Sequence, residues 1–325
     1  MSSTIAARPS KNPVFIRRQG SRHHVQATGP HEFPNARTAD ATSYRSLSEP
    51  NSPMHSRSTP SHRTRTDASL HMATLLLTAS IAPTQVTGLT RTDPALRIAD
   101  YVQALKHWLS NDRLPVDSLI FVDNTGANLD AIRSCINDYT GRKLRTQVLS
   151  VRPATIPTGI HYGYGELAMM DQAFRVSDIL QNTDLIIKST GRLYFPALRN
   201  LIHKLSSTVE MTVDCRANLT LANASRIPYA TTQLFTVTPA LYKTHLLDTL
   251  TWFEPRKGRT HLENRVFDAA IKASNEGHEV ILRFPVNCEP QGVTGHSGAN
   301  YRSASRLTRG MIRSVARRVT PDLWV

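Results

Sequence analysis

Candidate strands and helices alternate along the chain from residue 73 onward. Residues 73–83, 118–123 and 144–150 form largely apolar runs, and residues 93–109 and 129–139 place apolar side chains at helical spacing. Continuous apolar strands are typical of a sheet that is buried on both faces. The β-α-β-α-β order therefore predicts a largely parallel sheet with right-handed crossovers, whose ligands bind at the carboxyl ends of the strands.

The alternation continues through the second half of the chain. The pattern predicts helices over 166–181, 196–205, 239–250 and 262–273, and strands over 184–190, 209–214 and 231–237. We therefore expect one α/β fold, a mostly parallel sheet flanked by helices.

Residues 1–71 are expected not to fold on their own. They hold twelve Ser and ten Lys or Arg but only four Asp or Glu, and too few apolar side chains to offset chain entropy. Residues 1–31 contain basic residues and no acid, as organellar transit peptides do. A translation start at Met72 is the other interpretation. We expect a dispensable tail before a domain at 72–325.

The chain carries a formal net charge of +14, and its basic residues are not confined to the tail. This surplus favours an anionic partner, such as a phosphorylated metabolite, nucleic acid or membrane surface, although a solvated basic surface is the plain alternative. Cys135, Cys215 and Cys288 lack the paired spacing of a zinc site, so buried thiols in a reducing compartment are expected. The longest apolar run, 73–82, is too short to cross a bilayer.

Polar side chains stand where the first two predicted strands end. Thr78 and Ser80 lie at the end of the first strand, and Asp123 and Asn124 at the end of the second. Such groups could hydrogen-bond the base and ribose of a nucleotide. An Asp or Asn that caps the following helix would explain the same letters.

A glycine-tyrosine segment covers residues 161–166. Gly163 and Gly165 allow a phosphate or sugar to approach the backbone closely, and the tyrosines, Tyr164 among them, offer rings for stacking. Glu166 could serve a ligand, or it could be a first-turn acid that the helix dipole favours.

Two cations accompany the predicted strand at 184–190. Lys188 lies inside this strand, and Arg192 follows Thr190 and Gly191 just past its end. A buried cation needs an anion, and a diphosphate would serve. A structural ion pair of Lys188 with Asp214 or Glu263 is the alternative.

Two acids of the second half are candidate catalytic groups. Asp214 ends a predicted strand, with Arg216 on the same side of the extended chain, and this pair could bind a metal or a hydroxyl. Glu263 begins a predicted helix, where a general base would be held rigidly near the mouth of the sheet. A capping box from Thr260 to Glu263 would explain the same residues without catalysis.

The carboxyl-terminal segment is rich in glycine and arginine. A loop at 292–298 includes His296 and Ser297, and it precedes a predicted helix with arginines on one face. These arginines are Arg302, Arg306, Arg309, Arg313 and Arg317. A solvated face is the default interpretation, and phosphates or anionic lipid are the functional one. Nucleic acid is not the expected partner, because Tyr301 is the only aromatic residue among them.

No Ser-His-Asp arrangement, Walker loop or H-E-x-x-H motif occurs. Four segments in order, 75–83, 120–126, 163–166 and 186–192, resemble bacterial glycosyltransferases of the GT-A type, including enzymes of surface-polysaccharide gene clusters. The resemblance implies a nucleotide-sugar donor near Thr78, Asp123 and the loop at 163–166, and acceptor chemistry beyond residues 188–192. It also implies Glu263 as the base that deprotonates the acceptor hydroxyl, with Asp214 in reserve.

One departure from the family concerns the metal. Such enzymes commonly carry an Asp-x-Asp that binds a divalent ion and the donor diphosphate, whereas residues 189–192 read Ser-Thr-Gly-Arg here. No cofactor is therefore certain, and Mn or Mg would need other ligands. Lys188 and Arg192 could neutralise the leaving diphosphate instead.

These observations lead us to expect a GT-A-like glycosyltransferase at 72–325, with a Rossmann-like donor half at 72–192, an acceptor half at 193–295 and a basic helix at 296–325. The acceptor is expected to be a hydroxyl of a glycan or lipid-linked molecule. We expect a cytoplasmic protein, with peripheral contact at the inner membrane face as an option. A non-catalytic basic α/β module that binds nucleic acid or other polyanions is the alternative. The predicted acceptor or anion contacts are Arg216, His296, Ser297, Arg302 and Arg306.

Overall fold

The computed structural model describes residues 72–84, 89–217 and 228–295, and the single positions 298, 301, 310 and 314. The chain divides into two units, residues 1–63 and 64–325, and the described residues all belong to the second. The predictions for the tail and for most of the basic helix at 296–325 therefore lie outside the described residues. The same holds for four predicted anion contacts, His296, Ser297, Arg302 and Arg306.

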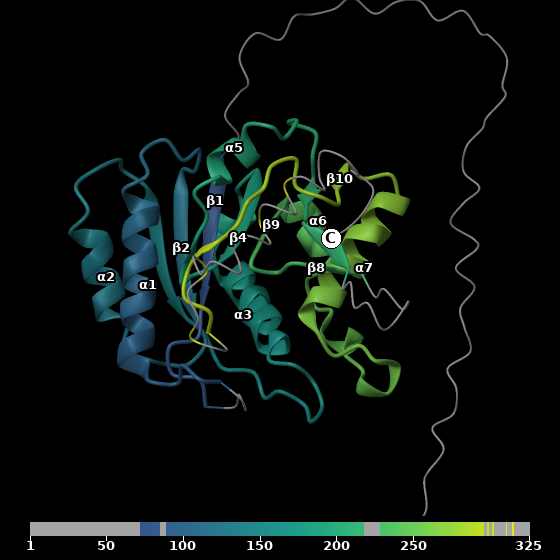
Figure 1. Ribbon diagram of the computed structural model, residues 1–325, viewed down its shortest axis with the longest axis horizontal. Helices are drawn as coiled ribbons and strands as arrows, with labels where there is room; N and C mark the ends of the chain where they lie inside the picture. Colours follow the sequence, from purple (N-terminus) through teal and green to yellow (C-terminus); the bar gives the residue numbers. More distant parts are fainter. Residues whose placement is uncertain are drawn as a thin grey trace, which may run out of the picture. The chain divides into compact units, whose positions relative to one another are not determined.

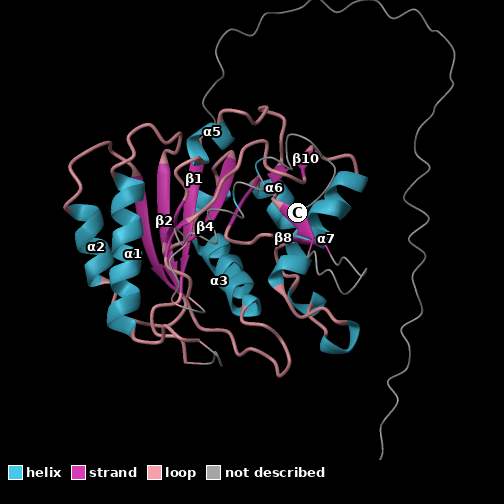
Figure 2. Cartoon of the chain, in the orientation of Figure 1, coloured by secondary structure: helices cyan, strands magenta, loops and turns pink. Residues whose placement is uncertain are grey.

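A seven-stranded sheet in the order β10-β6-β9-β4-β1-β2-β3 forms the centre of this unit (Figure 2). Its strands are β1 (Ala73–Ala79), β2 (Ser118–Asp123), β3 (Arg145–Ser150), β4 (Leu185–Thr190), β6 (Met211–Thr212), β9 (Leu234–Val237) and β10 (Val280–Ile281). Neighbouring strands are parallel, except that β9 runs antiparallel to both β4 and β6. The predicted mostly parallel sheet is confirmed, with one reversed strand.

Two short antiparallel pairs lie outside this sheet. They are β5 (Leu193–Tyr194) with β11 (Gln291–Gly292), and β7 (Cys215–Ala217) with β8 (Pro228–Ala230).

Helices cover both faces of the sheet (Figure 1). One face packs against α1 (Pro94–Leu109), α2 (Asp130–Asn137) and α5 (Leu198–Ile202). The other packs against α3 (Gly163–Val176), α4 (Asp178–Gln181), α6 (Pro239–His245) and α7 (Leu262–Asn275). None of the helices within the described ranges is long and apolar enough to cross a membrane.

The central strand β1 is buried on both sides because its apolar side chains alternate between the two layers. Leu75 and Leu77 pack with the residues of α1, whereas Leu76 packs with those of α3. Full burial of a leucine side chain stabilises the fold by roughly 1.5–3 kcal/mol. The continuous apolar run therefore holds the two helical layers on one sheet.

Local signals place the first helix where the sequence predicts it. The side chain of Asp93 accepts a hydrogen bond from the Ala95 N–H at 2.8 Å, and Pro94 occupies the first turn. The face that carries Tyr101, Leu105 and Trp108 is buried against the sheet.

Several predicted elements differ from the structure. The helix predicted over 166–181 begins earlier, at Gly163, and breaks at Ser177, which adopts an extended conformation and caps α4 through its side chain. The strand predicted over 209–214 divides, because its residues beyond Thr212 leave the central sheet and pair in β7. The helix predicted over 196–205 is shorter and spans Leu198–Ile202, and the helix predicted over 239–250 ends earlier, at His245.

Candidate active site

A cleft of about 410 Å³ opens where the order of the strands reverses. The chain pairs β1 with β2 on one side and with β4 on the other, so the carboxyl ends of β1 and β4 border a switch point of the kind where α/β sheets bind ligands. The volume is that of a small-molecule site. The strand ends contribute Thr78, Ser80, Asn124, Thr125, Thr190 and Arg192 to its lining.

Two helices begin at this cleft and touch each other there. A Cβ atom on Gly163, the first residue of α3, would lie 2.6 Å from the Cβ of Leu262, the first residue of α7. The rings of His161 and His261, just before the two helices, stack with centroids 4.5 Å apart. The amino-terminal ends of both helices, where backbone N–H groups favour anions, therefore lie beside the same cleft.

Glu166, in the first turn of α3, forms a buried ion pair with Lys188 of β4. The Lys188 Nζ atom is 2.6 Å from Oε1 of Glu166, and the Thr78 hydroxyl donates to the same oxygen at 2.8 Å. The ammonium also donates to the carbonyl of Thr232. Burial by itself would raise the pKa of Glu166, but the attraction of Lys188 outweighs this effect and holds that pKa below its ordinary value.

Lys188 does not line the cleft, and its side chain is fully buried. The predicted contact of Lys188 with a donor diphosphate is therefore not supported. The alternative of a structural ion pair holds, but its acid is Glu166 and not Asp214 or Glu263. The first turn of α3 places Glu166 against Thr78 of β1 and Lys188 of β4.

Glu263, in the first turn of α7, lines the cleft with a carboxylate that is only partly engaged. Its Oε1 atom accepts a hydrogen bond from the Thr232 hydroxyl at 3.4 Å, and its Oε2 atom is buried without a hydrogen-bond partner among the described residues. Burial raises the pKa of Glu263, and the nearby Glu166 carboxylate raises it further. The capping box with Thr260 is not formed, because the N-cap is His261 and makes no side-chain cap hydrogen bond.

Arg192 lines the cleft from the end of β4, next to the loop that follows β11. Its Nε atom donates to the carbonyl of Val293 at 3.1 Å. A Cβ atom on Gly295 would come within 2.6 Å of the guanidinium, so glycine lets this side chain lie against the loop. The glycine-rich loop singled out in the sequence therefore reaches the cleft with its described residues Thr294 and Gly295.

Asp123 lies beneath the cleft and does not line it. Its fully buried carboxylate accepts hydrogen bonds from the Ile81 N–H at 2.8 Å, the Thr125 N–H at 2.8 Å and the Thr125 hydroxyl at 2.7 Å. Neighbouring Asn124 does line the cleft, and its Oδ1 atom is buried without a partner in the described part of the chain. Asp123 thus fixes the loops after β1 and β2, and the polar contact offered to a ligand falls to Asn124.

Asp214 and Arg216 pair with each other away from the cleft lining. The Nε and Nη2 atoms of Arg216 lie 3.0 and 2.9 Å from Oδ2 of Asp214, whose side chain is buried. Burial would lower the pKa of Arg216, but Asp214 and Glu289 raise it above its ordinary value. This arrangement does not support Asp214 as a reserve base or Arg216 as a ligand contact at the cleft.

The two tyrosines of the segment at 161–166 take different positions. Tyr162 lines the cleft and its ring lies 3.8 Å from that of His161. Tyr164, which was the predicted contact, packs its ring against Phe253 at 5.3 Å and is not part of the lining. Because α3 begins at Gly163, its first turn directs Tyr164 toward the apolar layer around α7.

The cleft also includes residues that the sequence did not single out. Arg97 and Tyr101 of α1 line it, with the Arg97 Nε donating to the Ser80 carbonyl at 2.7 Å and the Tyr101 hydroxyl accepting from the Ser80 N–H at 2.9 Å. Their i, i+4 spacing puts both side chains on one face of α1. A polar pair on a face predicted to be buried could therefore have indicated these two residues from the sequence. Thr232, Gln233 and Tyr301 also line the cleft, and no local pattern marks them.

The cleft offers few carboxylates to a divalent metal. Its described lining offers two carboxylates, Glu166 and Glu263, and one oxygen of Glu166 already pairs with Lys188. Mg²⁺ and Mn²⁺ prefer several oxygen ligands, including carboxylates that are free to bind. The positive groups of the lining are instead Arg97 and Arg192.

Comparison with known proteins gives no family. No family model matches the chain, and neither does any curated protein sequence. Among solved structures, the inositol-1-phosphate CTP transferase of T. maritima is 14% identical over 75% of this chain and 96% of that chain, with a TM-score of 0.45. A mannosyltransferase from Pyrobaculum calidifontis, solved with GDP-Man and Mn²⁺, is 13% identical over 77% of this chain and 64% of that chain, with a TM-score of 0.42.

A putative glucose-1-phosphate thymidylyltransferase from Bacillus anthracis is 9% identical over 74% of this chain and 94% of that chain, with a TM-score of 0.38. These three proteins are nucleotidyl- or glycosyltransferases. Likenesses with TM-scores below 0.5 do not assign an activity to this chain.

Proposed function

We propose that the cleft is the active site of a glycosyltransferase. It would move a sugar from a nucleotide-sugar donor to a hydroxyl of a glycan or lipid-linked acceptor, in surface-polysaccharide biosynthesis. The observation that carries this proposal is Glu263, a partly buried side chain with a raised pKa and a buried, unpartnered oxygen, in the same cleft as the cationic Arg192.

The donor would lie along the carboxyl ends of β1, β2 and β4. Arg192 and Arg97 supply positive charge to the lining, and the amino-terminal ends of α3 and α7 add backbone N–H groups. These groups suit a diphosphate. Asn124, with its unpartnered Oδ1 atom, would hydrogen-bond the nucleoside, and the exposed ring of Tyr162 would stack on a base or sugar.

Glu263 would act as the general base for the acceptor. The acceptor oxygen forms a bond to the anomeric carbon, the bond from that carbon to the diphosphate oxygen breaks, and the acceptor's proton passes to Glu263. The nucleoside diphosphate leaves with the electron pair of the broken bond, and Arg192 stabilises its negative charge. A raised pKa suits this role, because a base works best when its pKa lies near the operating pH.

The ion pair of Glu166 and Lys188 would position this machinery. Its Glu166 lines the cleft and its Lys188 does not, and the pair joins the first turn of α3 to β4. The Glu166 carboxylate contributes to the raised pKa of Glu263, and Lys188 lowers that pKa in turn. The pair would therefore tune the base while it holds Thr78 and the Thr232 carbonyl in place.

Nucleotidyl transfer is the second candidate, because the cleft could also hold a nucleoside triphosphate. In that reaction a phosphate oxygen of the acceptor attacks, and it is already ionised at neutral pH. Such a nucleophile needs no base, so the partly engaged Glu263 favours a hydroxyl acceptor.

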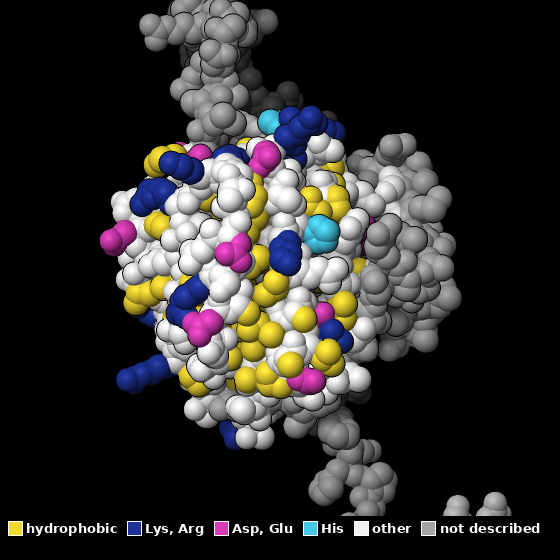
Figure 3. Space-filling view, turned by 90° about the vertical axis from the view of Figure 1, so that its left-hand side faces the viewer, with side chains coloured by type: hydrophobic (Ala, Val, Ile, Leu, Met, Phe, Trp, Pro, Cys, Tyr) yellow, Lys and Arg dark blue, Asp and Glu magenta, His cyan; other side chains and the backbone are white. Residues whose placement is uncertain are grey.

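Binding of a polyanion is less favoured on the face that carries α1 and α2, where Lys and Arg are interspersed with Asp and Glu (Figure 3).

The first test is a thermal-shift panel of the full chain against UDP, GDP, CMP and their sugar conjugates. A ligand at a hundred times its Kd stabilises a fold by about 2.7 kcal/mol, which is measurable. We expect one nucleotide class to raise the Tm. Release of a nucleoside diphosphate upon addition of acceptor would identify glycosyl transfer, whereas release of pyrophosphate from a nucleoside triphosphate would identify nucleotidyl transfer.

Variants separate binding from chemistry. Glu263→Gln should keep the nucleotide-induced shift and lose turnover by about 10²- to 10⁴-fold, the usual contribution of a general base. Arg192→Met should lose the shift itself. Arg133→Met, on the exposed surface of α2, is the matched control and should change neither. Unchanged turnover in Glu263→Gln would contradict the proposal.

A further inference from the structure

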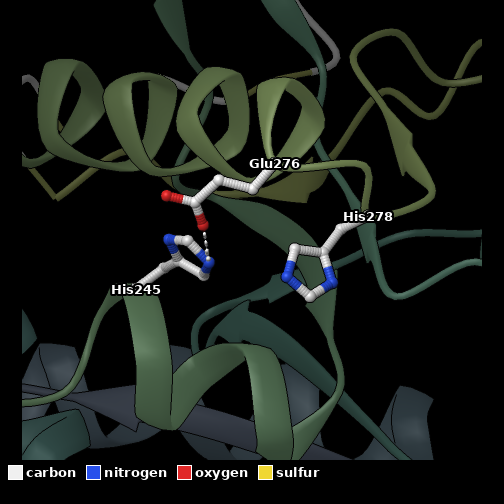
Figure 4. A group of neighbouring side chains, drawn as sticks. All are labelled: His245, Glu276 and His278. Atoms are coloured by element: carbon white, nitrogen blue, oxygen red, sulfur yellow. Dashed lines mark ion pairs between the residues drawn. The ribbon is translucent and has the colours of Figure 1, made fainter.

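A second group of chemically capable side chains lies away from the cleft, where α6 and α7 end. His245 is the last residue of α6, Glu276 follows α7, and His278 stands two residues before β10 (Figure 4). One potential ligand atom of each lies within 4.8 Å of the others. Within the described ranges, this is the one group of three or more His, Cys, Asp or Glu side chains that is so placed.

His245 is the strongest sign that this group binds something. The residue is 2% exposed, and neither ring nitrogen has a hydrogen-bond partner in the part of the chain that the structure describes. Its Nε2 atom points toward Glu276 and lies 3.3 Å from the Oε2 atom (Figure 4). A metal ion between these two atoms would also satisfy a buried ring nitrogen that makes no hydrogen bond.

His278 is oriented by a carboxylate from another element. Its Nδ1 atom lies 2.9 Å from Oε2 of Glu210, the residue just before β6. Its other ring nitrogen faces His245 and Glu276 (Figure 4). A carboxylate that accepts the Nδ1 proton of a histidine leaves a lone pair on Nε2, and this is how metal-binding histidines are usually held.

We propose that His245, Glu276 and His278 bind a divalent transition-metal ion of the zinc class, with Glu210 orienting His278. Two imidazoles and one carboxylate suit Zn²⁺, whereas Mg²⁺ and Ca²⁺ prefer oxygen ligands throughout. Three protein ligands leave the fourth tetrahedral position to water. Zinc–nitrogen bonds of about 2.0–2.1 Å require the ligand atoms to lie closer than 4.8 Å, and Glu276, 45% exposed, has room to close onto the ion.

Two neighbouring cations oppose the ion. The Arg265 guanidinium donates a hydrogen bond to the carbonyl of His245. The Lys272 Nζ atom lies 3.7 Å from Oε1 of Glu276, but this side chain is 67% exposed and can move into water. The opposite oxygen of Glu276 is the one that faces His245.

The ion would join three elements that carry the second half of the fold. It would tie the end of α6 to the end of α7 and to the segment before β10, and through Glu210 to the start of β6. The backbone of Glu210 is already bonded to Glu279 at 2.9 Å. Because α7 begins at the cleft with Glu263, the metal would anchor the far end of the helix that carries this residue.

The test is Zn²⁺ binding to the full chain, measured by calorimetry after removal of metal with a chelator. The sequence has 13 histidines, so sites elsewhere must be subtracted. We expect wild type to bind one Zn²⁺ more per chain than His278→Gln or Glu276→Gln. His203→Gln, an exposed histidine after α5, is the matched control and should bind like wild type.

Two further readouts check the geometry. Glu210→Gln should weaken binding at this site by about 10- to 100-fold, the usual effect of removing an orienting carboxylate. Zn²⁺ should raise the Tm of wild type by more than that of His278→Gln, and Mg²⁺ should raise neither. Equal stoichiometry and equal Tm shifts in wild type, His278→Gln and Glu276→Gln would overturn the proposal. Both replaced side chains are partly exposed, so these variants are expected to fold.

Discussion

The ion pair between Glu166 and Lys188 allows a quantitative prediction. Glu166→Gln leaves a fully buried ammonium whose remaining contacts in the described structure are the Thr232 carbonyl and the face of Phe235, 5.8 Å away. Lys188→Met instead leaves a carboxylate with 19% of its side chain exposed and with the Thr78 hydroxyl as a donor. The two single variants therefore leave unpaired charges in different surroundings: a buried ammonium in Glu166→Gln and a partly exposed carboxylate in Lys188→Met.

The expected magnitudes follow from this asymmetry. Leaving a buried charge unpaired lowers the free energy of unfolding by about 3–5 kcal/mol, and we expect this loss for Glu166→Gln. Lys188→Met should cost less, about 1–3 kcal/mol, because water in the cleft can solvate the remaining carboxylate. The double variant, Glu166→Gln with Lys188→Met, leaves no charge unpaired and should be more stable than Glu166→Gln alone.

Urea denaturation followed by circular dichroism would measure these free energies of unfolding. The pKa of Glu166 is lowered in the fold, so the pair stabilises the protein above the unfolded pKa of about 4.3, and this contribution is lost as the pH falls through the lower folded value. The gap between wild type and the double variant should shrink accordingly. A loss below about 1 kcal/mol for Glu166→Gln, or a larger loss for Lys188→Met, would refute the reasoning.

Three further predictions concern other residues around the cleft. Glu263→Gln should raise the Tm at neutral pH, because burial penalises the ionised carboxylate. The gain should shrink as the pH falls below the raised pKa of Glu263 and should be gone below the ordinary pKa of a glutamate, whereas a lower Tm at neutral pH would contradict this. Gly163→Ala should lose about 1–3 kcal/mol in urea unfolding, because its Cβ would lie 2.6 Å from that of Leu262. Gly165→Ala, whose Cβ would meet nothing closer than 3.7 Å, is the control, and equal losses would count against the close approach of the helices. Asp123→Ala removes three hydrogen bonds and should cost about 3 kcal/mol by the same assay, so a loss below about 1 kcal/mol would show that the loops do not depend on it.

The candidate site was predictable only in part. The sequence placed Thr78, Asn124 and Arg192 at strand ends and Glu263 at a helix start, and the structure brings all four to one cleft. Strand ends meet at one edge of a parallel sheet, so the topology alone predicts this neighbourhood. Glu263 as base remains a prediction, and its partner Thr232 carried no local signal.

The sequence did not indicate which distant side chains contact each other. Lys188 pairs with Glu166, and not with either acid considered for it, because the first turn of α3 lies beside this residue of β4. Tyr162 faces the cleft and Tyr164 does not, because the start of α3 sets the rotation of its first turn.

The sequence by itself determined the succession of elements and the two-sided burial of the strands. Apolar periodicity and caps such as Asp93 act within a few residues, so their outcome can be read along the chain. Only the tertiary structure decided that β9 runs antiparallel and that His245 lies beside His278. These outcomes depend on which distant elements pack together. That choice is set by the burial of whole faces, which no local pattern encodes.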